Sequence, residues 1–261
     1  MIGKPPAIRD NQDVFRTVEF SSWSNRADLD ADERYLISTY LDPTRRTLEA
    51  GTGGGRILLA MMGMGFSSLS GFDFVPELIA EARRRDASAA IDFQVQDATQ
   101  LTYADASFDQ LIYLQQVICF MEGEDARRRA LKEAIRILRP GGTALFSLLS
   151  FEVRSRSPLY SLFLTYLRVL RVLRGASRNR QTLPWLRLGG RFNFASLLDR
   201  GPRVYWYRVQ EAAGLLQDVG FTLRAIGTSR QIKDDRLHTS PDTLCHEGLA
   251  GTLYCVCAKP S

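Results

Sequence analysis

The sequence most suggestive of chemistry is TLEAGTGGGRILLA, residues 47–60, which places an acid and a run of glycines between two apolar segments. Gly51, Gly53 and Gly55 can adopt backbone angles that other residues avoid, and they leave room for a ligand beside the chain. The helix expected to follow would point its free amide groups at that ligand. The turn is therefore expected to hold a nucleotide-like molecule.

Two further acids follow at the ends of predicted strands. Asp73 ends the second strand, where a carboxylate can accept hydrogen bonds from ribose hydroxyls, and Asp97 ends the third, where it can accept one from an adenine amino group. A nicotinamide or flavin dinucleotide is the obvious candidate ligand, and its fingerprint is G-x-G-x-x-G or G-x-G-x-x-A. Counted from Gly51, the sixth position is Arg56, so this fingerprint fails. The pattern is instead E-x-G-x-G-x-G, from Glu49 to Gly55.

These residues sit in an alternation of predicted strands and helices. Strands are predicted at 45–50, 68–73, 90–97, 107–117, 143–150, 221–229 and 251–259, and helices at 55–65, 76–87, 124–142 and 207–221. Such alternation implies right-handed crossovers and a parallel sheet covered on both faces. The predicted fold is α/β, a Rossmann-like doubly wound sheet, mostly parallel with an antiparallel last strand, plus a helical cap insertion.

The alternation breaks at about residue 151, and we divide the chain there. Residues 151–203 hold eleven arginines against two acids, Glu152 and Asp199. We expect an N-terminal helical cap segment at 1–44, a cofactor-binding core at 45–150, an arginine-rich cap insertion at 151–203 and the rest of the core at 204–261. A smaller insertion is expected at 230–250.

Four motifs in register point to a known family. LEAGTGGGR, GFDFVPELIAEAR, VQDATQLTYADASFDQLIYLQQV and LRPGGTALFS resemble, in order and spacing, the motifs of class I S-adenosylmethionine-dependent methyltransferases. The likeness is to small-molecule enzymes related to quinone-biosynthesis methyltransferases, and it covers residues 45–150 and, more weakly, 205–228. It implies S-adenosyl-L-methionine as cofactor and S-adenosyl-L-homocysteine as product.

The resemblance also implies roles for individual residues. The three glycines would lie against the methionine part of the cofactor, Asp73 on the ribose, Phe74 beside the adenine, and Asp97 with Ala98 at the adenine edge. Gln116 would sit near the transferred methyl group. The implied cofactor-binding residues are Glu49, Gly51, Thr52, Gly53, Gly55, Asp73, Phe74, Asp97, Ala98 and Gln115.

Methyl transfer from an activated donor depends mainly on positioning, and a base is needed only if the acceptor must lose a proton. No conspicuous catalytic residue stands out, and the weak candidates are Gln116, Tyr207, His238 and His246. Either histidine could be a base if its loop folds over the site, or could be a surface residue. No metal site is expected, because Cys245 beside His246 is too sparse a ligand set.

The acceptor is less clearly written in the sequence. In this family, enzymes that methylate exocyclic amines of DNA bases, or glutamine in proteins, typically carry an Asn/Asp-Pro-Pro-aromatic motif after the fourth strand, and LQQV departs from it. This argues against an amino group of a nucleic acid base as the acceptor, but not against every RNA substrate. Residues 157–177 have helical apolar spacing with Arg168, Arg171 and Arg174 in a row. This helix is interpreted as a lid over a hydrophobic or anionic acceptor, as an in-plane helix on an anionic membrane, or simply as a helix packed on the sheet domain.

The predicted function is methyl transfer to a small, hydrophobic or aromatic acceptor by in-line displacement. The alternatives are a non-catalytic cofactor-binding module that docks a membrane or partner through its basic cap, and an RNA methyltransferase. The net charge of +5 allows an anionic partner. A cytoplasmic location is expected, with peripheral membrane contact as an open alternative. The acceptor, the methylated atom, the oligomeric state and the pathway stay open.

Overall fold

A computed structural model describes residues 11–24, 28–176 and 178–261, and its centre is a seven-stranded sheet of order β10-β11-β5-β4-β1-β2-β3. Neighbours from β3 to β5 are parallel, whereas β11 runs antiparallel to both β5 and β10. The strands are β1 (Thr47–Ala50), β2 (Leu69–Asp73), β3 (Asp92–Val95), β4 (Phe108–Tyr113), β5 (Leu138–Leu148), β10 (Thr222–Thr228) and β11 (Leu253–Ala258). The predicted Rossmann-like fold with an antiparallel last strand is confirmed.

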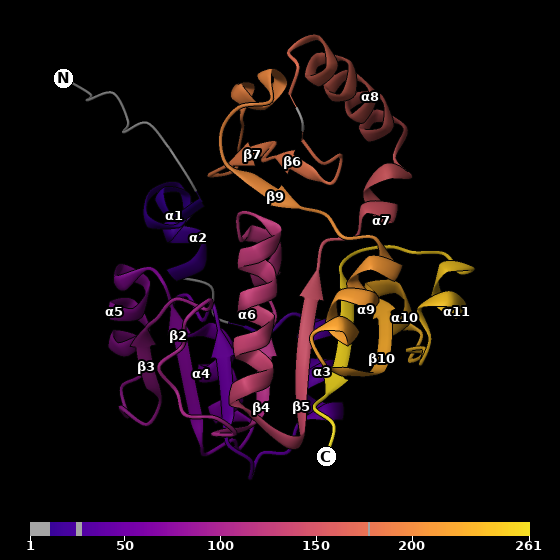
Figure 1. Cartoon of the computed structure of the whole chain (residues 1–261). Coiled ribbons are helices and arrows are strands. Elements are labelled where there is room, and N and C mark those ends of the chain that lie inside the picture. The colour runs from indigo at the N-terminus through magenta and orange to yellow at the C-terminus, as the bar shows by residue number, and fades with distance from the viewer. Residues whose placement is uncertain (1–10, 25–27, 177) are drawn as a thin grey trace, which may run out of the picture.

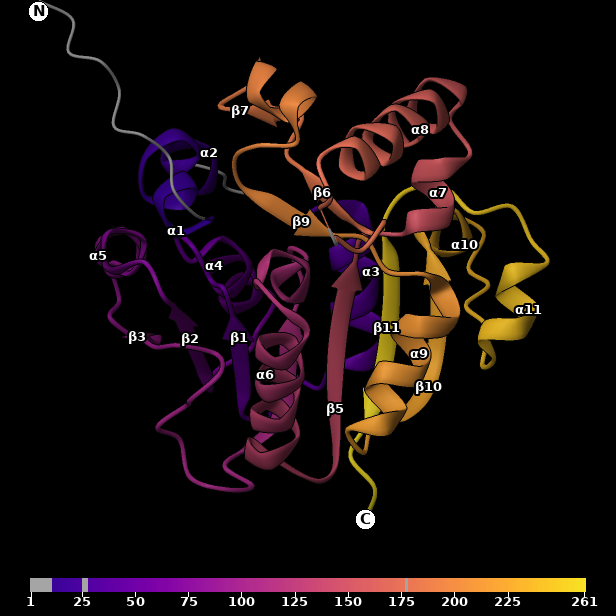
Figure 2. The ribbon, with the colours of Figure 1, turned by 45° about the horizontal axis from the view of Figure 1, so that its top comes forward.

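Helices cover both faces of this sheet (Figures 1 and 2). One face carries α3 (Ala31–Tyr40), α4 (Arg56–Gly63) and α5 (Pro76–Arg85), and the other carries α6 (Glu124–Ile137) and α9 (Val209–Asp218). Because successive strand residues point to opposite faces, Leu111 packs in the α6–α9 cluster and Ile112 in the α3–α5 cluster. This two-sided burial explains why the strands read as continuous apolar runs.

The strand order reverses at β1, which lies between β2 and β4. In open α/β sheets, ligands bind beyond the carboxyl ends of the strands at such a reversal. The glycine turn follows β1, Asp73 ends β2, and Gln115 and Gln116 follow β4 together with the short helix η2 (Val117–Phe120). The topology thus gathers the predicted site residues at one edge.

Two predicted boundaries are clearly wrong. The strand expected over 107–117 ends at Tyr113, so Gln115 and Gln116 lie beyond it. The helix expected over 124–142 ends at Ile137, and β5 already begins at Leu138. Leu138 pairs with Phe108 of β4, and the Gly141 amide donates to the carbonyl of Lys259 at 2.9 Å. Pairing with neighbouring strands therefore places the Pro-Gly-Gly sequence within the long strand.

The arginine-rich insertion lies above the carboxyl edge of the sheet (Figure 1). Its helices are α7 (Phe151–Ser155), α8 (Pro158–Leu173) and η3 (Phe194–Leu198), and its strands are β6 (Thr182–Pro184), β7 (Arg187–Leu188), β8 (Arg191–Phe192) and β9 (Arg203–Tyr205). β6 pairs with β9 and β7 with β8. The cap thus combines helices with two short β-ribbons and is not the wholly helical cap that the sequence predicts. Strands of two or three residues form through pairing with distant residues, so the local sequence does not reveal them. The four-part division of the chain stays a prediction.

The remaining elements flank the sheet. Beside α5 lie α1 (Asn11–Asp13), η1 (Val14–Val18) and α2 (Phe20–Ser24), and beside β10 and β11 lie α10 (Ser229–Lys233) and α11 (Pro241–Cys245) (Figure 1). Within the described residues, no helix has the length and apolar character to cross a membrane.

Candidate active site

A cavity of about 560 Å³ opens at the carboxyl edge where the strand order reverses. Its lining combines the N-terminal helices, the glycine turn, the ends of β2, β3 and β4, and the start of α6. Seven of the predicted cofactor-binding residues line it: Gly51, Gly53, Asp73, Phe74, Asp97, Ala98 and Gln115. The structure therefore brings most of the predicted cofactor-binding residues, called the cradle below, into one cavity.

The glycines of the turn are needed for two different reasons. Gly51 and Gly53 have φ of 64° and 54°, and a Cβ on Gly51 would lie 2.7 Å from a methyl carbon of Val117. Gly55, with φ of 78°, does not line the cavity, and a Cβ there would lie 2.8 Å from the ring of Phe93 on β3. The first two glycines keep space beside the cavity, whereas the third lets α4 pack against the sheet.

Asp73 is the best-defined polar group of the cavity. It is buried, its Oδ2 accepts a hydrogen bond from the Gly53 amide at 3.0 Å, and its Oδ1 accepts one from the Val75 amide at 3.0 Å. Burial raises the pKa of Asp73 to about 6, against the opposing effect of these amide bonds. The carboxylate is thereby fixed at the cavity wall with acceptor capacity left on each oxygen.

Glu49 lies beneath the turn and does not line the cavity. Its Oε2 accepts a hydrogen bond from the hydroxyl of Thr52 at 2.7 Å, so both of these predicted residues shape the turn from below. Burial raises the pKa of Glu49 to about 8, although Thr52 and Arg56 act in the opposite direction.

A buried ion pair that the sequence analysis missed ties α3 to the glycine turn. Arg56 donates through Nη1 and Nη2 to the two carboxylate oxygens of Glu33, at 2.6 and 2.7 Å, and Nη1 also donates to the Asp28 carbonyl at 2.6 Å. Gln115 donates to the same carboxylate. Arg56, which breaks the dinucleotide fingerprint, thus points away from a ligand and into the protein. Its partner lies 23 residues away and outside any motif, so the sequence carried no local signal for the pair.

Of the adenine-side residues, Asp97 and Ala98 lie on the loop after β3, and Phe74 directly follows β2. Asp97 is exposed, and its Oδ1 accepts hydrogen bonds from the amide and hydroxyl of Thr99 at 2.8 and 2.9 Å. Ala98 is buried, and Phe74 is 39% exposed at the cavity. This side of the cavity can take a flat polar ring between an apolar surface and a carboxylate.

Gln115 and Gln116 both have left-handed backbones, with φ of 73° and 58°. Such angles are uncommon for residues other than glycine and cost energy, so the surroundings must hold them. The Gln116 amide donates to the Ser147 hydroxyl at 2.9 Å, which anchors this bend. Gln115 lines the cavity, whereas Gln116 is not among its lining residues.

An aromatic wall borders the cavity. The ring of Phe15 lies edge-on to Trp23, Phe74 and Phe120, with centroids 6.1, 6.3 and 5.3 Å away. Trp185 of the cap adds to the group at 4.9 Å from Phe120. Of these rings only Phe74 belongs to a motif named in the sequence analysis, and the others come from segments that no motif marks.

The other weak catalytic candidates lie apart from the cavity. Tyr207 is buried under the cap, where burial raises the pKa of its hydroxyl. His238 Nε2 lies 3.2 Å from Glu247 Oε2, and His246 is exposed at the end of α11. None of the three lines the cavity in the described structure. Nor do three His, Cys, Asp or Glu side chains come together as a metal site within the described residues.

Comparison with known proteins identifies the core of this fold. Residues 48–146 match the family model described as a methyltransferase domain. The chain carries a methyltransferase domain. The class I S-adenosylmethionine-dependent type predicted from the motifs is thereby confirmed for this domain, and with it the predicted cofactor.

The methyltransferase domain has relatives of similar sequence and shape. It is similar to a ubiquinone/menaquinone biosynthesis C-methyltransferase of Desulfotalea psychrophila, 31% identical over 42% of this chain and 44% of that protein. It is also similar to a phthiotriol/phenolphthiotriol dimycocerosates methyltransferase of Mycobacterium ulcerans, 29% identical over 54% and 51%. The chain thus spans about half the length of these relatives. In fold the whole chain resembles the CcbJ methyltransferase of Streptomyces caelestis, with a TM-score of 0.65 and 14% identity over 95% of this chain and 98% of that one.

The residues at the cavity fit this cofactor. A buried carboxylate with free acceptor capacity suits a ribose, and a cavity edge without side chains at Gly51 and Gly53 suits close approach of a ligand. Acids at and beneath the turn suit a cationic ligand better than a pyrophosphate. Glu49, Thr52 and Gly55 support the cradle without lining it.

Proposed function

We propose that the protein transfers a methyl group from S-adenosylmethionine to a small, hydrophobic or aromatic acceptor. One observation carries this proposal: a single cavity joins the glycine-and-acid cradle to the aromatic wall of Phe15, Trp23 and Phe120. The cradle suits the cofactor, and the wall offers an apolar surface to a second molecule beside it.

The chain's own residues hold and shield the reactants. Asp73 would accept hydrogen bonds from the ribose, and the loop of Asp97 and Ala98 would bind the adenine edge. When bound, the cofactor would supply an electrophilic methyl group on a sulfonium, and transfer of that methyl group leaves the sulfur as a neutral thioether. The N-terminal helices cover the turn, since the Gly54 amide donates to the Trp23 carbonyl at 3.2 Å and Arg85 donates to the carbonyls of Ser24 and Gly54 at 2.8 Å. This cover excludes water from the reacting atoms.

The residues that line the cavity suit catalysis by positioning of the reactants rather than by proton transfer. The ionisable side chains that the structure places in the cavity wall are Asp73, Asp97 and Glu122, and no histidine or lysine is among the described lining residues. Holding two reactants in line can supply a large share of the rate enhancement. The acceptor's own nucleophile therefore attacks with little help from a base.

The relatives support a hydrophobic acceptor. Their names refer to quinone biosynthesis and to phthiotriol dimycocerosates, and both names denote hydrophobic compounds. The aromatic wall of this chain would suit such a compound, because flat or apolar groups pack against aromatic faces and edges.

The test combines binding and turnover. Calorimetry should detect binding of S-adenosylhomocysteine, and a panel of quinols and phenols should yield S-adenosylhomocysteine as product. Phe120→Ala should raise the KM for the acceptor and leave cofactor affinity within about twofold, because a truncated wall loses apolar contact with the acceptor only. Phe192→Ala, on the exposed cap ribbon, is the matched control.

Two results would overturn the proposal. Folded protein that binds no cofactor would refute the cradle. Cofactor binding without turnover over the whole panel would favour a non-catalytic cofactor-binding module instead.

A further inference from the structure

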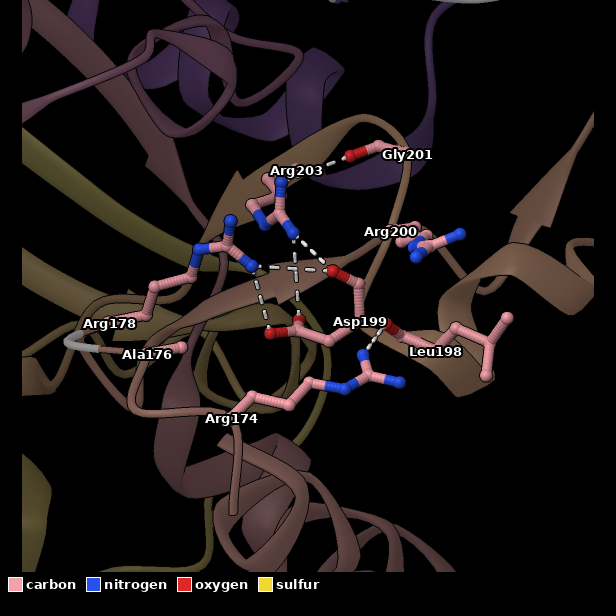
Figure 3. A pocket seen from close by; sticks show the side chains of 8 residues that line it. All are labelled: Arg174, Ala176, Arg178, Leu198, Asp199, Arg200, Gly201 and Arg203. Carbon is pink, nitrogen blue, oxygen red and sulfur yellow. Dashed lines mark hydrogen bonds and ion pairs between the residues drawn. The ribbon is translucent and has the colours of Figure 1, made fainter. Parts of the chain in front are cut away.

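A second cavity, of about 450 Å³, lies within the cap and is lined largely by arginine. Arg174, Arg178, Arg200 and Arg203 line it together with Asp199, a buried carboxylate at the end of η3, and the side chains of Arg178 and Arg203 point toward Asp199 (Figure 3). This second cavity is formed wholly by cap residues and shares no lining residue with the candidate active site.

This arginine pocket holds more positive charge than Asp199 can balance. Asp199 pairs with Arg171 at 2.9 Å, with Arg178 at 3.1 Å and with Arg203 at 3.8 Å. The Nε of Arg203 is buried without a hydrogen-bond partner in the described structure. Arg174, which donates to the Leu198 carbonyl, and Arg200 also line the pocket, and neither forms an ion pair with Asp199 in the described structure. The pocket is therefore suited to a further anion with several acceptor oxygens.

An apolar surface borders the arginine pocket. Along α8, the residues Leu159, Leu162, Tyr166, Val169 and Leu173 follow one another at intervals of three or four, and they are 80%, 69%, 43%, 53% and 79% exposed. This spacing places them on one face of the helix. In Figure 1, α8 lies at the top of the cap, on the side away from the sheet.

The helix η3 extends this apolar face toward the pocket. The Tyr166 hydroxyl donates to the Leu197 carbonyl at 2.6 Å, and Arg174 donates to the Leu198 carbonyl at 2.7 Å. Phe194 is 74% exposed, and Leu198 both is exposed and lines the arginine pocket. The apolar face and the arginine pocket therefore share a rim.

The charges of the cap decide between possible occupants. The eleven arginines between residues 151 and 203 face two acids, Glu152 and Asp199, neither of which is exposed. A second copy meeting this face through a two-fold axis would set arginine against arginine. An anionic bilayer offers both an apolar layer for the leucines and phosphates for the guanidinium groups.

We propose that the cap docks on an anionic membrane surface, with the apolar face of α8 and η3 in the interfacial layer and a lipid headgroup phosphate in the arginine pocket. Long arginine side chains around an apolar surface are suited to this depth, because their stems are apolar and their ends reach phosphates. The proposal does not depend on methyl transfer. Docking would also bring Trp185, which belongs to the cap and contacts the aromatic wall, near a source of hydrophobic acceptors.

Sedimentation with vesicles tests the docking. Wild-type protein should bind vesicles of phosphatidylglycerol and phosphatidylcholine more tightly than vesicles of phosphatidylcholine alone, and salt should weaken the binding. Arg174→Gln with Arg200→Gln should weaken it by about fivefold per arginine. The matched control, Arg129→Gln with Arg224→Gln, removes the same charge from exposed positions on α6 and β10 and should leave most of the binding.

A second variant separates insertion from electrostatics. Leu162→Ser with Leu173→Ser changes exposed side chains, so the fold should persist by circular dichroism while vesicle binding falls at least tenfold. Equal binding to both vesicle types, equal loss in the arginine variant and its control, or no effect of the leucine changes would each overturn the proposal. Stabilisation by glycerol phosphate without vesicle binding would assign the pocket to a free phosphate compound, and would also overturn it.

Discussion

The buried carboxylate of Asp73 gives the sharpest test of the cofactor site. Each of its oxygens already accepts a backbone amide, from Gly53 and from Val75. In Asp73→Asn, the new NH₂ group must face one of those N–H donors, and the charge that attracts hydroxyl donors is lost. Hydrogen bonds to charged groups are worth about 1.5–3 kcal/mol, so affinity for S-adenosylhomocysteine should fall about 10- to 100-fold.

The pKa of Asp73 adds a pH dependence to this effect. Burial raises the pKa to about 6 in the ligand-free protein, and hydrogen bonds from ribose hydroxyls would favour the ionised form and lower the pKa again. Binding should therefore release protons as the pH falls toward 6. The apparent Kd should rise about tenfold from pH 7 to pH 5, because most of the carboxyl is then protonated before binding.

Titration calorimetry at pH 5, 6 and 7 measures both quantities. Buffers of different ionisation enthalpy should report release of about half a proton per ligand at pH 6. Asp73→Asn should bind weakly with a flat profile, whereas Asp92→Asn, an exposed acid on β3 outside the cavity, should behave as wild type. A wild-type Kd that stays constant from pH 5 to 7, or a profile that survives in Asp73→Asn, would refute the reasoning.

Three further changes test the support of the turn. Gly51→Ala should abolish cofactor binding in calorimetry, because the new Cβ would lie 2.7 Å from the Val117 side chain. The control is Gly65→Ala, which also has positive φ but has open space around it. It should lower stability through backbone strain alone and leave cofactor binding unchanged. Glu33→Gln should destabilise the protein by about 3–5 kcal/mol in chemical unfolding, since it leaves the buried Arg56 without its ion pair. Glu49 has its folded pKa raised to about 8 by burial, so wild-type stability should fall as pH rises from about 4.5 to 8, and Glu49→Gln should remove that fall in thermal unfolding.

The fold and the cradle were predictable because their signals are local. Glycines after a strand, acids at strand ends and Pro at the start of α5 each act through neighbouring residues. Strand alternation then fixed the sheet edge at which these residues meet. The position of Gly55 was less accurately predicted, because lining a cavity and supporting it from below produce the same spacing.

The aromatic wall and the Glu33 ion pair were beyond sequence reasoning for the opposite reason. Phe15, Phe120 and Trp185 come from three segments separated by more than sixty residues each, and only the packing of cap and N-terminal helices brings them together. Asn11 shows how that packing is fixed, since its Nδ2 donates to the carbonyls of both Phe120 and Arg203, the latter at 2.8 Å. No periodicity or motif encodes such a junction.

The buried acids around the glycine turn favour a cationic ligand over a dinucleotide. Three carboxyl groups, Glu33, Glu49 and Asp73, are buried around the turn, and Arg56 pairs directly with one of them. Burial raises the pKa of Glu49 to about 8 and that of Asp73 to about 6. A cationic ligand bound nearby would lower both pKa values, because it stabilises the ionised carboxylates. A pyrophosphate would add negative charge here, whereas a sulfonium and an ammonium group offset the buried acids. The protein should therefore bind S-adenosylmethionine and show no competition from NAD at millimolar concentration, and effective competition by NAD would contradict this account of the turn.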